Sequence, residues 1–272
     1  MDESTVDAST LSPSRPACIA SEQVPVMDPS IFRVLQTASC TVERTLHDLR
    51  EIHLLAGLTR EELQSIDQRL VAGRRKVRQG ELLFRAGDRF DSVYEVRTGF
   101  FKTVVHSLRG AEQVTGFQMA GELIGLEAIA TGRHALDAIA LEDSLVWALR
   151  YADLLALSRE IPALQEHFHR RMSTEIANAH AAMLQLGSMD AEERVAGFLL
   201  DLMHRLEVRG FSPTSVQLRM SRAEIGSLLG LKPETVSRAL SKLQTAGLLD
   251  VQQRSVTATD PAGLGRILGG LF

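Results

Sequence analysis

Four polar side chains on one face of a short predicted helix are the residues of this chain best suited to bind another molecule. Glu234, Ser237, Arg238 and Ser241 recur at i, i+3, i+4 and i+7, so a helix places them side by side. Arginine can donate two hydrogen bonds to guanine O6 and N7, and glutamate can accept one from cytosine N4. A helix with these residues near its N-terminus is therefore suited to contact base edges in the major groove of DNA.

Neighbouring polar and basic residues extend this candidate surface. Residues 217–254 contain six basic and three acidic residues, whereas the whole chain has a net charge of -4. A modestly basic end on an acidic protein fits specific DNA binding with little sequence-independent attraction. The predicted DNA-contacting residues are Ser221, Arg222, Lys232, Glu234, Thr235, Ser237, Arg238, Ser241 and Lys242.

A pair of short helices must position these side chains. Ser221 and Glu224 form a predicted capping box that starts the first helix, and Gly230 supplies the left-handed conformation that ends it. Pro233 suits the first position of the second helix. The predicted inward stripe of that second helix is Val236, Leu240 and Leu243. The alternative is an ordinary amphipathic hairpin whose polar face is only solvated.

The surroundings of the helix pair indicate a winged helix-turn-helix. Asp190 and Glu193 predict a capping box before a helix with a broad apolar face. Residues 211–220 are typical of a turn and a strand, and residues 248–259 of a hairpin. Helix, strand, two helices and a hairpin, in this order, make that DNA-binding architecture.

An apolar stripe runs along a long predicted helix over residues 161–186. Its members are Met172, Ile176, Ala179, Met183 and Leu186, spaced 4, 3, 4 and 3 residues apart. This is the a/d pattern of a helix that pairs with another helix, so we predict a homodimer interface here. A single helix packed on its own barrel is the alternative.

Residues 71–149 have a different pattern, in which glycines separate short β-prone runs. This pattern predicts an antiparallel barrel or sandwich, with a mixed α+β fold as the alternative. A short helix precedes it, because Thr59 and Glu62 form a further capping box. Residues 1–30 are rich in Ser, Thr, Pro and acidic residues without periodicity, which is typical of disorder.

These patterns together predict an α+β protein of four parts. We expect a disordered tail over 1–40, a sensor β-barrel with N-terminal helices over 41–158, a dimerisation helix over 159–188 and a winged helix-turn-helix over 189–272. No apolar run is long enough to span a membrane, and the N-terminus lacks the apolar stretch of a secretory signal, so we expect a cytoplasmic protein.

Catalytic motifs are missing from the sequence. We find no phosphate-binding loop, metalloprotease helix, nucleophile elbow or Cys–His nucleophile pair, so we do not expect an enzyme. A small-molecule-binding module with a vestigial DNA domain is the main rival to a DNA-binding regulator. The capping, turn and polar residues of 221–249 favour the regulator.

The chain resembles the CRP/FNR family of transcription regulators over about residues 44–265, and within that family the FNR branch most closely. The segments that carry the resemblance are AGELIGLEAIATG, NAHAAMLQLGSMDAEERVAGFLLDL, RGFSPTSVQLRMSRAEIGSLLGL and ETVSRALSKLQ. The resemblance implies a cyclic-nucleotide-binding-like barrel, a dimer, RNA polymerase as a partner and activation of transcription. It also implies that Glu234, Ser237 and Arg238 contact TTGAT half-sites in TTGAT-N4-ATCAA palindromes.

The sequence departs from the oxygen-sensing members of this family. Those proteins hold a [4Fe–4S] cluster through four cysteines, and the matching positions here carry Arg44, His47, His53 and Trp147. Arg and Trp do not ligate iron, so we expect no cluster. The only cysteines, Cys18 and Cys40, lie in the N-terminal segment, and we expect plain or weakly reactive thiols there.

The sequence also departs from the cyclic-nucleotide-binding members. Gly121 and Glu122 match the start of the phosphate cassette, but Leu136 and Asp137 stand where an Arg and a Ser or Thr would hold the phosphate. An acidic residue repels a phosphate, so we expect no response to cyclic AMP.

The signal is not identified by the sequence. Imidazole suits iron, so His47 and His53 leave open a haem- or other ligand-responsive sensor of the same architecture; the alternative is that they are surface polar residues. His167 and His169 lie on different faces of one helix and do not chelate together. We predict no bound metal and assign no cofactor site.

Overall fold

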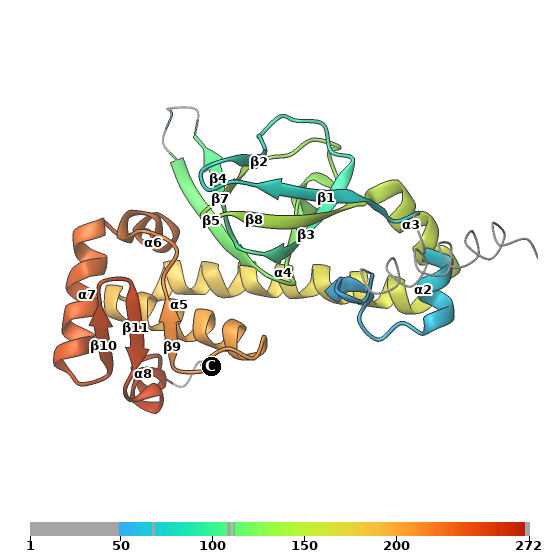
Figure 1. The fold of residues 1–272 in the computed structure, drawn as a ribbon. Helices are drawn as coiled ribbons and strands as arrows, with labels where there is room; N and C mark the ends of the chain where they lie inside the picture. The colour runs from blue at the N-terminus through green and yellow to red at the C-terminus, as the bar shows by residue number, and fades with distance from the viewer. Residues whose placement is uncertain (1–48, 67–68, 108–109, 111, 270–272) are drawn as a thin grey trace, which may run out of the picture. The chain divides into compact units, whose positions relative to one another are not determined.

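The structure is a computed structural model that describes residues 49–66, 69–107, 110 and 112–269 (Figure 1). The predicted tail over 1–40, with Cys18 and Cys40, lies outside the described residues, as do Arg44 and His47.

Two four-stranded antiparallel sheets form the N-terminal domain, as the glycine-punctuated pattern predicts. The first sheet has the strand order β1-β8-β3-β6 and the second β2-β7-β4-β5. The strands are β1 (Val71–Val77), β2 (Leu82–Phe84), β3 (Ser92–Thr98), β4 (Phe100–His106), β5 (Glu112–Met119), β6 (Leu123–Ile124), β7 (Asp137–Ala140) and β8 (Ser144–Arg150). The expected antiparallel barrel is therefore confirmed.

Alternating apolar residues fill the space between these sheets. Phe101, Val96 and Val146 are fully buried in one cluster, with contributions from both sheets. Gly99 joins β3 to β4 with a φ of 99°, and a Cβ at this position would overlap the Ser144 side chain. This hairpin therefore requires glycine for both its conformation and its space.

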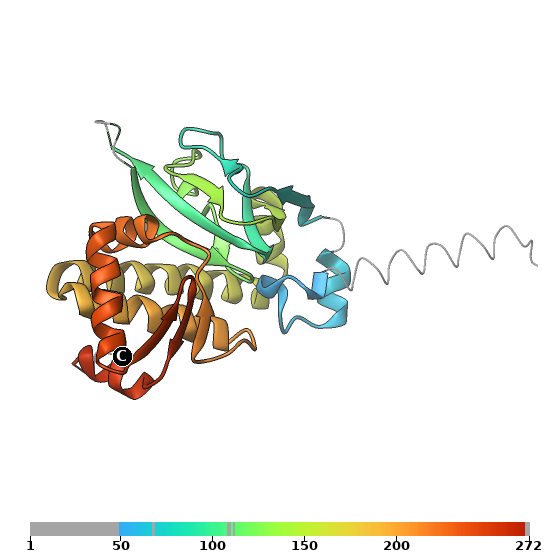
Figure 2. The ribbon, with the colours of Figure 1, turned by 60° about the vertical axis from the view of Figure 1, so that its left-hand side comes forward.

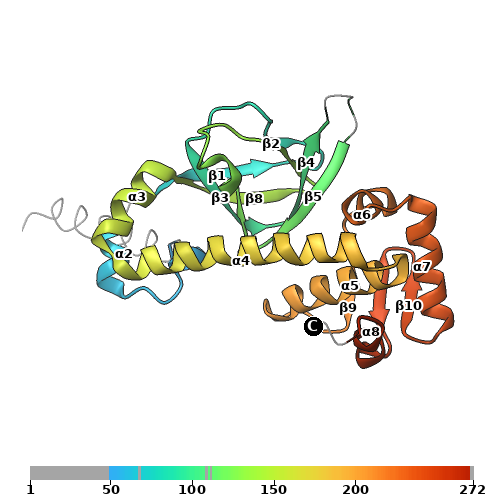
Figure 3. The ribbon, with the colours of Figure 1, turned by 180° about the vertical axis from the view of Figure 1, so that it is seen from behind.

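Helical segments cover one end of the barrel. The 3-10 helix η1 (His53–Leu55) and the helix α2 (Arg60–Ile66) precede the strands, and α3 (Tyr151–Glu160) follows them. Thr59 and Glu62 cap α2 as predicted, because each side chain bonds the backbone N–H of the other. These helices share one apolar cluster with the beginning of the long helix α4 (Pro162–Ser188), shown as a continuous helix in Figure 3.

The C-terminal domain is a winged helix-turn-helix, as expected. Its helices are α5 (Ala191–Glu207), α6 (Arg222–Leu229), α7 (Pro233–Thr245) and α8 (Pro261–Ile267). Its strands β9 (Ser215–Gln217), β10 (Leu249–Gln252) and β11 (Ser255–Ala258) form one antiparallel sheet in the order β10-β11-β9 (Figure 2). Helix α8 was not predicted from the sequence pattern; Asp260 caps it by accepting from the Gly263 N–H.

Candidate DNA-binding interface

The turn between α6 and α7 is fixed by its local chemistry. Ser221 and Glu224 complete the predicted capping box at the start of α6. Gly230 ends the helix with a φ of 64°, in the left-handed region. Gly226 lies against the turn, since a Cβ there would approach the Leu231 carbonyl oxygen to 2.5 Å. The close approach of the two helices therefore depends on the residue types found in the sequence.

Helix α7 has one buried and one exposed side. The buried residues are Val236, Ala239, Leu240 and Leu243, which join a cluster that also contains residues of α5 and α6. The inward stripe predicted from the sequence is thereby confirmed, with Ala239 added. Burial of this stripe fixes the rotation of α7 about its axis and so determines which side chains face outward.

The exposed side of α7 carries the predicted base-contacting residues. Glu234, Ser237, Arg238 and Ser241 are exposed, and Thr235 is half-buried. The hydroxyls of Ser237 and Ser241 donate to carbonyl oxygens one turn earlier in the helix. Within the described part of the chain, Arg238 makes a single side-chain hydrogen bond, a long one of 3.4 Å to Thr235 Oγ1, so its guanidinium still has donors for an external acceptor.

Two of the flanking predicted residues also have structural roles. The Ser221 hydroxyl is engaged with Glu224 in the capping box. Arg222 donates to the Gln253 carbonyl oxygen at 3.1 Å and so ties α6 to the β10–β11 hairpin. Burial, and then the charge of Arg254, lower the pKa of Arg222. The positive charges of Arg222 and Arg254 therefore repel each other. An anion such as a DNA phosphate would reduce this repulsion.

The other two flanking residues are lysines at the ends of α7. Lys232 is the exposed N-cap residue of the helix and makes no side-chain cap. Lys242 is exposed and forms an ion pair with Glu192 of α5. All nine predicted contact residues thus lie on or beside α6 and α7.

The predicted seam of α4 is exposed in the described chain. Ile176 and Met183 are 58% and 69% exposed, and Leu186 and Ala179 are exposed as well. Met172 is half-buried because it packs against the cluster at the end of the barrel. Four apolar side chains in a continuous helical stripe therefore face outward from a single chain, which is unusual for a surface without a partner.

The position that matches the barrel cysteine of the FNR branch is filled by an indole. Trp147 is 3% exposed, and Arg74 and Arg97 lie over its ring at 4.6 and 5.6 Å from the centroid. His53 is held by Glu95, whose buried carboxylate accepts the His53 N–H at 2.6 Å. A packed indole beside two cations offers no ligand to iron, so these residues do not fit an iron–sulfur cluster.

The position of the phosphate-binding pair is equally unsuited to its ligand. Asp137 accepts the Ala86 N–H at 2.7 Å and lies 2.9 Å from His106 Nε2. Burial raises the pKa of Asp137, but these hydrogen bonds outweigh burial and leave the pKa below its ordinary value. The carboxylate is therefore a fixed negative charge beside Leu136, and the pair does not fit a cyclic phosphate.

Sequence patterns did not reveal the contacts that join the barrel to the C-terminal domain. Lys102 of β4 forms a 2.7 Å ion pair with Glu224, which also caps α6. The Val114 N–H donates to Ser227 Oγ at 2.9 Å. Helix α6 therefore sits against the β4–β5 hairpin through bonds from both strands.

A second set of contacts is centred on Glu122. Its carboxylate accepts from Arg205 and Arg209 at 2.6 and 2.7 Å, from the end of α5 and just beyond it. Burial lowers the pKa of Arg205, but Glu122 outweighs burial and raises it overall. The glutamate that matches the phosphate cassette in the sequence therefore binds the DNA domain here.

Among the described residues we find no group of three or more His, Cys, Asp or Glu side chains that could hold a metal ion. Within the same part of the chain, no helix combines the length and the apolar character that a membrane crossing requires.

Two domain families match the chain. The cyclic nucleotide-binding domain matches residues 74–160, and the Crp-like helix-turn-helix domain matches residues 193–267. The two matches correspond to the barrel with α3 and to the winged helix-turn-helix.

Several regulators are similar over most of their length. The transcriptional regulatory protein btr of Bordetella pertussis is 40% identical over 213 residues, which is 78% of this chain and 88% of the relative. The fumarate and nitrate reduction regulatory protein of Escherichia coli K12 is 35% identical, over 88% of this chain and 95% of the relative. The solved structure of FixK2 from Bradyrhizobium japonicum has a TM-score of 0.66 at 32% identity, and the alignment covers 73% of this chain and 98% of FixK2.

Proposed function

Because the chain belongs to the CRP/FNR family of transcription regulators, we propose that it binds FNR-like palindromes as a homodimer and activates transcription. The observation that carries this proposal is the two-sided helix α7, which buries its apolar stripe and presents Glu234, Ser237 and Arg238 to the outside. Their spacing and types match the requirements for direct contact with base edges. The division into a tail, a sensor barrel, a dimerisation helix and a DNA domain belongs to the same proposal.

Each residue of the interface has an assigned role in this proposal. Arg238 donates to the guanine of a TTGAT half-site, Glu234 accepts from a cytosine N4, and Ser237 and Thr235 supplement these contacts. The remaining residues Ser221, Arg222, Lys232, Ser241 and Lys242 contact phosphates and fix the register of the helix on the duplex.

The homodimer rests on the exposed seam of α4. Burial of Ile176 and Met183 against a second copy would remove apolar area from water and stabilise the pair. A two-fold dimer presents two recognition helices to two half-sites about 34 Å apart, which matches a palindromic site.

We propose that this regulator responds to a signal other than oxygen or cyclic AMP, which are sensed by the two branches compared above. Trp147 does not suit an iron–sulfur cluster, and Asp137 does not suit a cyclic phosphate. The proposed regulator therefore uses neither an oxygen-labile cluster nor cyclic AMP as its switch. A haem- or other ligand-responsive regulator of the same architecture is the alternative. Contact with RNA polymerase is part of the same proposal, because the chain belongs to a family of transcription regulators.

Fluorescence anisotropy with the purified chain tests the proposal. At one fixed salt concentration, a labelled TTGAT-N4-ATCAA duplex should bind at least about 1,000-fold more tightly than a scrambled duplex. Equal affinity for both duplexes would remove the support for sequence-specific regulation, and the module with a vestigial DNA domain would replace it.

A further inference from the structure

The C-terminal end of the long helix α4 lies beside α5, α6 and α7, as Figures 1 and 3 show. Met189, the C-cap residue of α4, is buried in the apolar cluster that contains the inward residues of these three helices. Asp190 follows it directly and caps α5. Only these two residues separate the proposed dimerisation helix from the first helix of the DNA domain, so the contacts at this junction determine how the two are oriented.

One arginine at the start of α5 connects the segments that meet here. Arg194 Nε donates to the Met189 carbonyl oxygen at 2.9 Å, and Nη2 donates to the Leu186 carbonyl oxygen at 2.9 Å. Nη1 donates to the Leu229 carbonyl oxygen at 3.0 Å. Each nitrogen of the guanidinium is therefore bonded to a backbone oxygen, and each of the three bonds leads from α5 to another segment.

The three acceptors belong to the C-terminal ends of two helices. Leu186 lies in the last turn of α4, Met189 is the C-cap of α4, and Leu229 is the last residue of α6. The last carbonyl groups of a helix have no partner within it and carry the negative end of its dipole. A guanidinium shared by two such ends therefore holds them together by charge as well as by hydrogen bonding.

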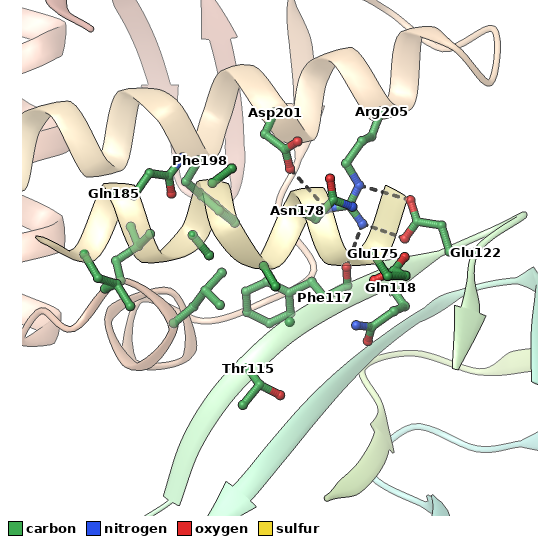
Figure 4. A pocket seen from close by; sticks show the side chains of 17 residues that line it. Thr115, Phe117, Gln118, Glu122, Glu175, Asn178, Gln185, Phe198, Asp201 and Arg205 are labelled. Atoms are coloured by element: carbon green, nitrogen blue, oxygen red, sulfur yellow. Dashed lines mark hydrogen bonds and ion pairs between the residues drawn. The ribbon is translucent and has the colours of Figure 1, made fainter. Parts of the chain in front are cut away.

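Close packing surrounds this guanidinium. A Cβ on Gly230, the residue that ends α6, would lie 3.4 Å from Leu186 Cδ2 and 3.5 Å from Arg194 Nη1. Gln185 of α4 lies against Gly197 of α5, where a Cβ would approach Gln185 Nε2 to 3.2 Å (Figure 4). A change in the mutual orientation of α4, α5 and α6 would therefore have to break these contacts.

The recognition helix is joined to the same turn of α5. Lys242 of α7 pairs with Glu192, two residues before Arg194. The buried stripe of α7 also packs in the cluster that contains Met189. Helix α7 is thus linked to the end of α4 through both α5 and α6.

We propose that Arg194 is the positioning residue that sets the distance and angle between the two recognition helices of the dimer. The inference rests on the proposed function, because such a spacing has a meaning only for a dimer on two half-sites. Arg194 fixes α6 and α7 relative to α4, and the seam of α4 fixes one protomer relative to its partner. One side chain in each protomer therefore determines which spacer length between the half-sites is accepted.

Three duplexes separate this role from simple stabilisation of the fold. They are the TTGAT-N4-ATCAA palindrome, the same palindrome with one base pair added to the spacer, and a duplex with a single half-site. The added base pair moves the second half-site by about 3.4 Å and turns it by about 34°. At fixed salt, the parent protein should bind the unaltered palindrome at least about 10-fold more tightly than the lengthened one.

Arg194→Lys keeps the charge, but one ammonium group cannot bond three separate oxygens. This variant should bind the unaltered palindrome about 10-fold more weakly than the parent, because the orientation of the recognition helices is no longer preset. It should distinguish the two spacers by less than about 3-fold, and its affinity for the single half-site should equal that of the parent. Arg194→Met, which also removes the charge, should behave in the same way.

Arg266→Lys is the matched control, since it makes the same change at an exposed arginine of α8 and should keep the spacing preference of the parent. An undiminished spacing preference in both Arg194 variants would overturn the proposal. An equal loss of affinity for all three duplexes would also overturn it, because it would show that Arg194 only stabilises the fold. A parent protein that binds neither palindrome more tightly than the single half-site would overturn the proposed function, and this inference with it.

Discussion

At the scale of single residues, Arg238 is the side chain on which the proposed sequence preference depends. Arg238→Ala should weaken binding to the palindrome by about 1–3 kcal/mol and relax the preference at one base pair of each half-site. The reason is the loss of a bidentate contact to guanine, which a methyl group cannot replace. Binding-site selection followed by sequencing measures both effects.

Arg266→Ala is the matched control for this change. Arg266 is an arginine on α8, paired with Asp260 and outside the helix pair. Its loss should leave the selected sequence unaltered. If the Arg238→Ala protein selects the same bases as the parent, the assignment of Arg238 is wrong.

Glu224 makes stability depend on pH. Burial raises its pKa, but Lys102 and Ser221 outweigh burial, so the folded-state pKa lies below the ordinary value of 4.5. The unfolded chain therefore binds more protons as the pH falls, and the stabilisation, complete at neutral pH, is lost below about pH 4.5. Glu224→Gln should lower the unfolding free energy at pH 7 and flatten its decrease in acid.

Urea denaturation at several pH values measures this dependence. Lys102→Met should have a smaller effect in the same direction, because it removes only the ion pair and leaves the cap. Parallel pH profiles for Glu224→Gln and the parent protein would mean that this carboxylate is not stabilised in the fold.

At the scale of elements, the helix-turn-helix depends on a glycine inside α6. Gly226→Ala should lower the unfolding free energy by about 1–3 kcal/mol, because its Cβ would lie 2.5 Å from the Leu231 carbonyl oxygen. Gly265→Ala is the control: it lies in α8 with no atom within 4 Å of its would-be Cβ, and should stabilise by about 0.5–1 kcal/mol. Thermal or urea unfolding of both variants tests the pair; destabilisation of equal size in both would contradict the account.

Local signals in the sequence predicted most of these elements. Three capping boxes, at Thr59, Asp190 and Ser221, begin helices where predicted. Such signals are reliable because the bonds join residues three positions apart, and the energy is available to the segment by itself. The 3.6-residue periodicity of α7 likewise predicted its buried stripe.

Contacts between distant segments could not be predicted in the same way. Glu122 and Arg205 are 83 residues apart, and no periodicity connects them. In the sequence Glu122 was interpreted through its place in the phosphate cassette, and only the packing of α5 on β5 reveals its actual partner. A pocket of about 240 Å³ has the same origin, since residues of β5, α4, α5 and α6 line it (Figure 4).

At the scale of the whole molecule, the proposed dimer depends on the seam of α4. Ile176→Asp should weaken self-association about 10-fold or more, because it places like charges opposite each other in an apolar interface. Ala177→Asp adds the same charge at the next residue, which is exposed and lies outside the seam, and should leave the dimer unchanged. Analytical ultracentrifugation of both variants, in air and under nitrogen, measures the association constant.

The parent protein should be a dimer in both atmospheres, because the proposal contains no oxygen-labile cluster. A monomer in air that dimerises only under nitrogen would reveal a redox switch, with Cys18 and Cys40 as the first residues to test. If Ile176→Asp leaves the association constant unchanged, the dimer interface lies elsewhere.

In the proposed function, one dimer places two recognition helices on two half-sites at a fixed spacing. The most direct test is the affinity of the protein for palindromes whose spacer is lengthened in steps. Adding about five base pairs turns one half-site to the opposite side of the duplex, since a helical turn contains about 10.5 base pairs. We predict that this insertion raises the dissociation constant at least about 100-fold at fixed salt. An affinity that does not change with spacer length would contradict the account, because it would mean that each half-site is bound independently.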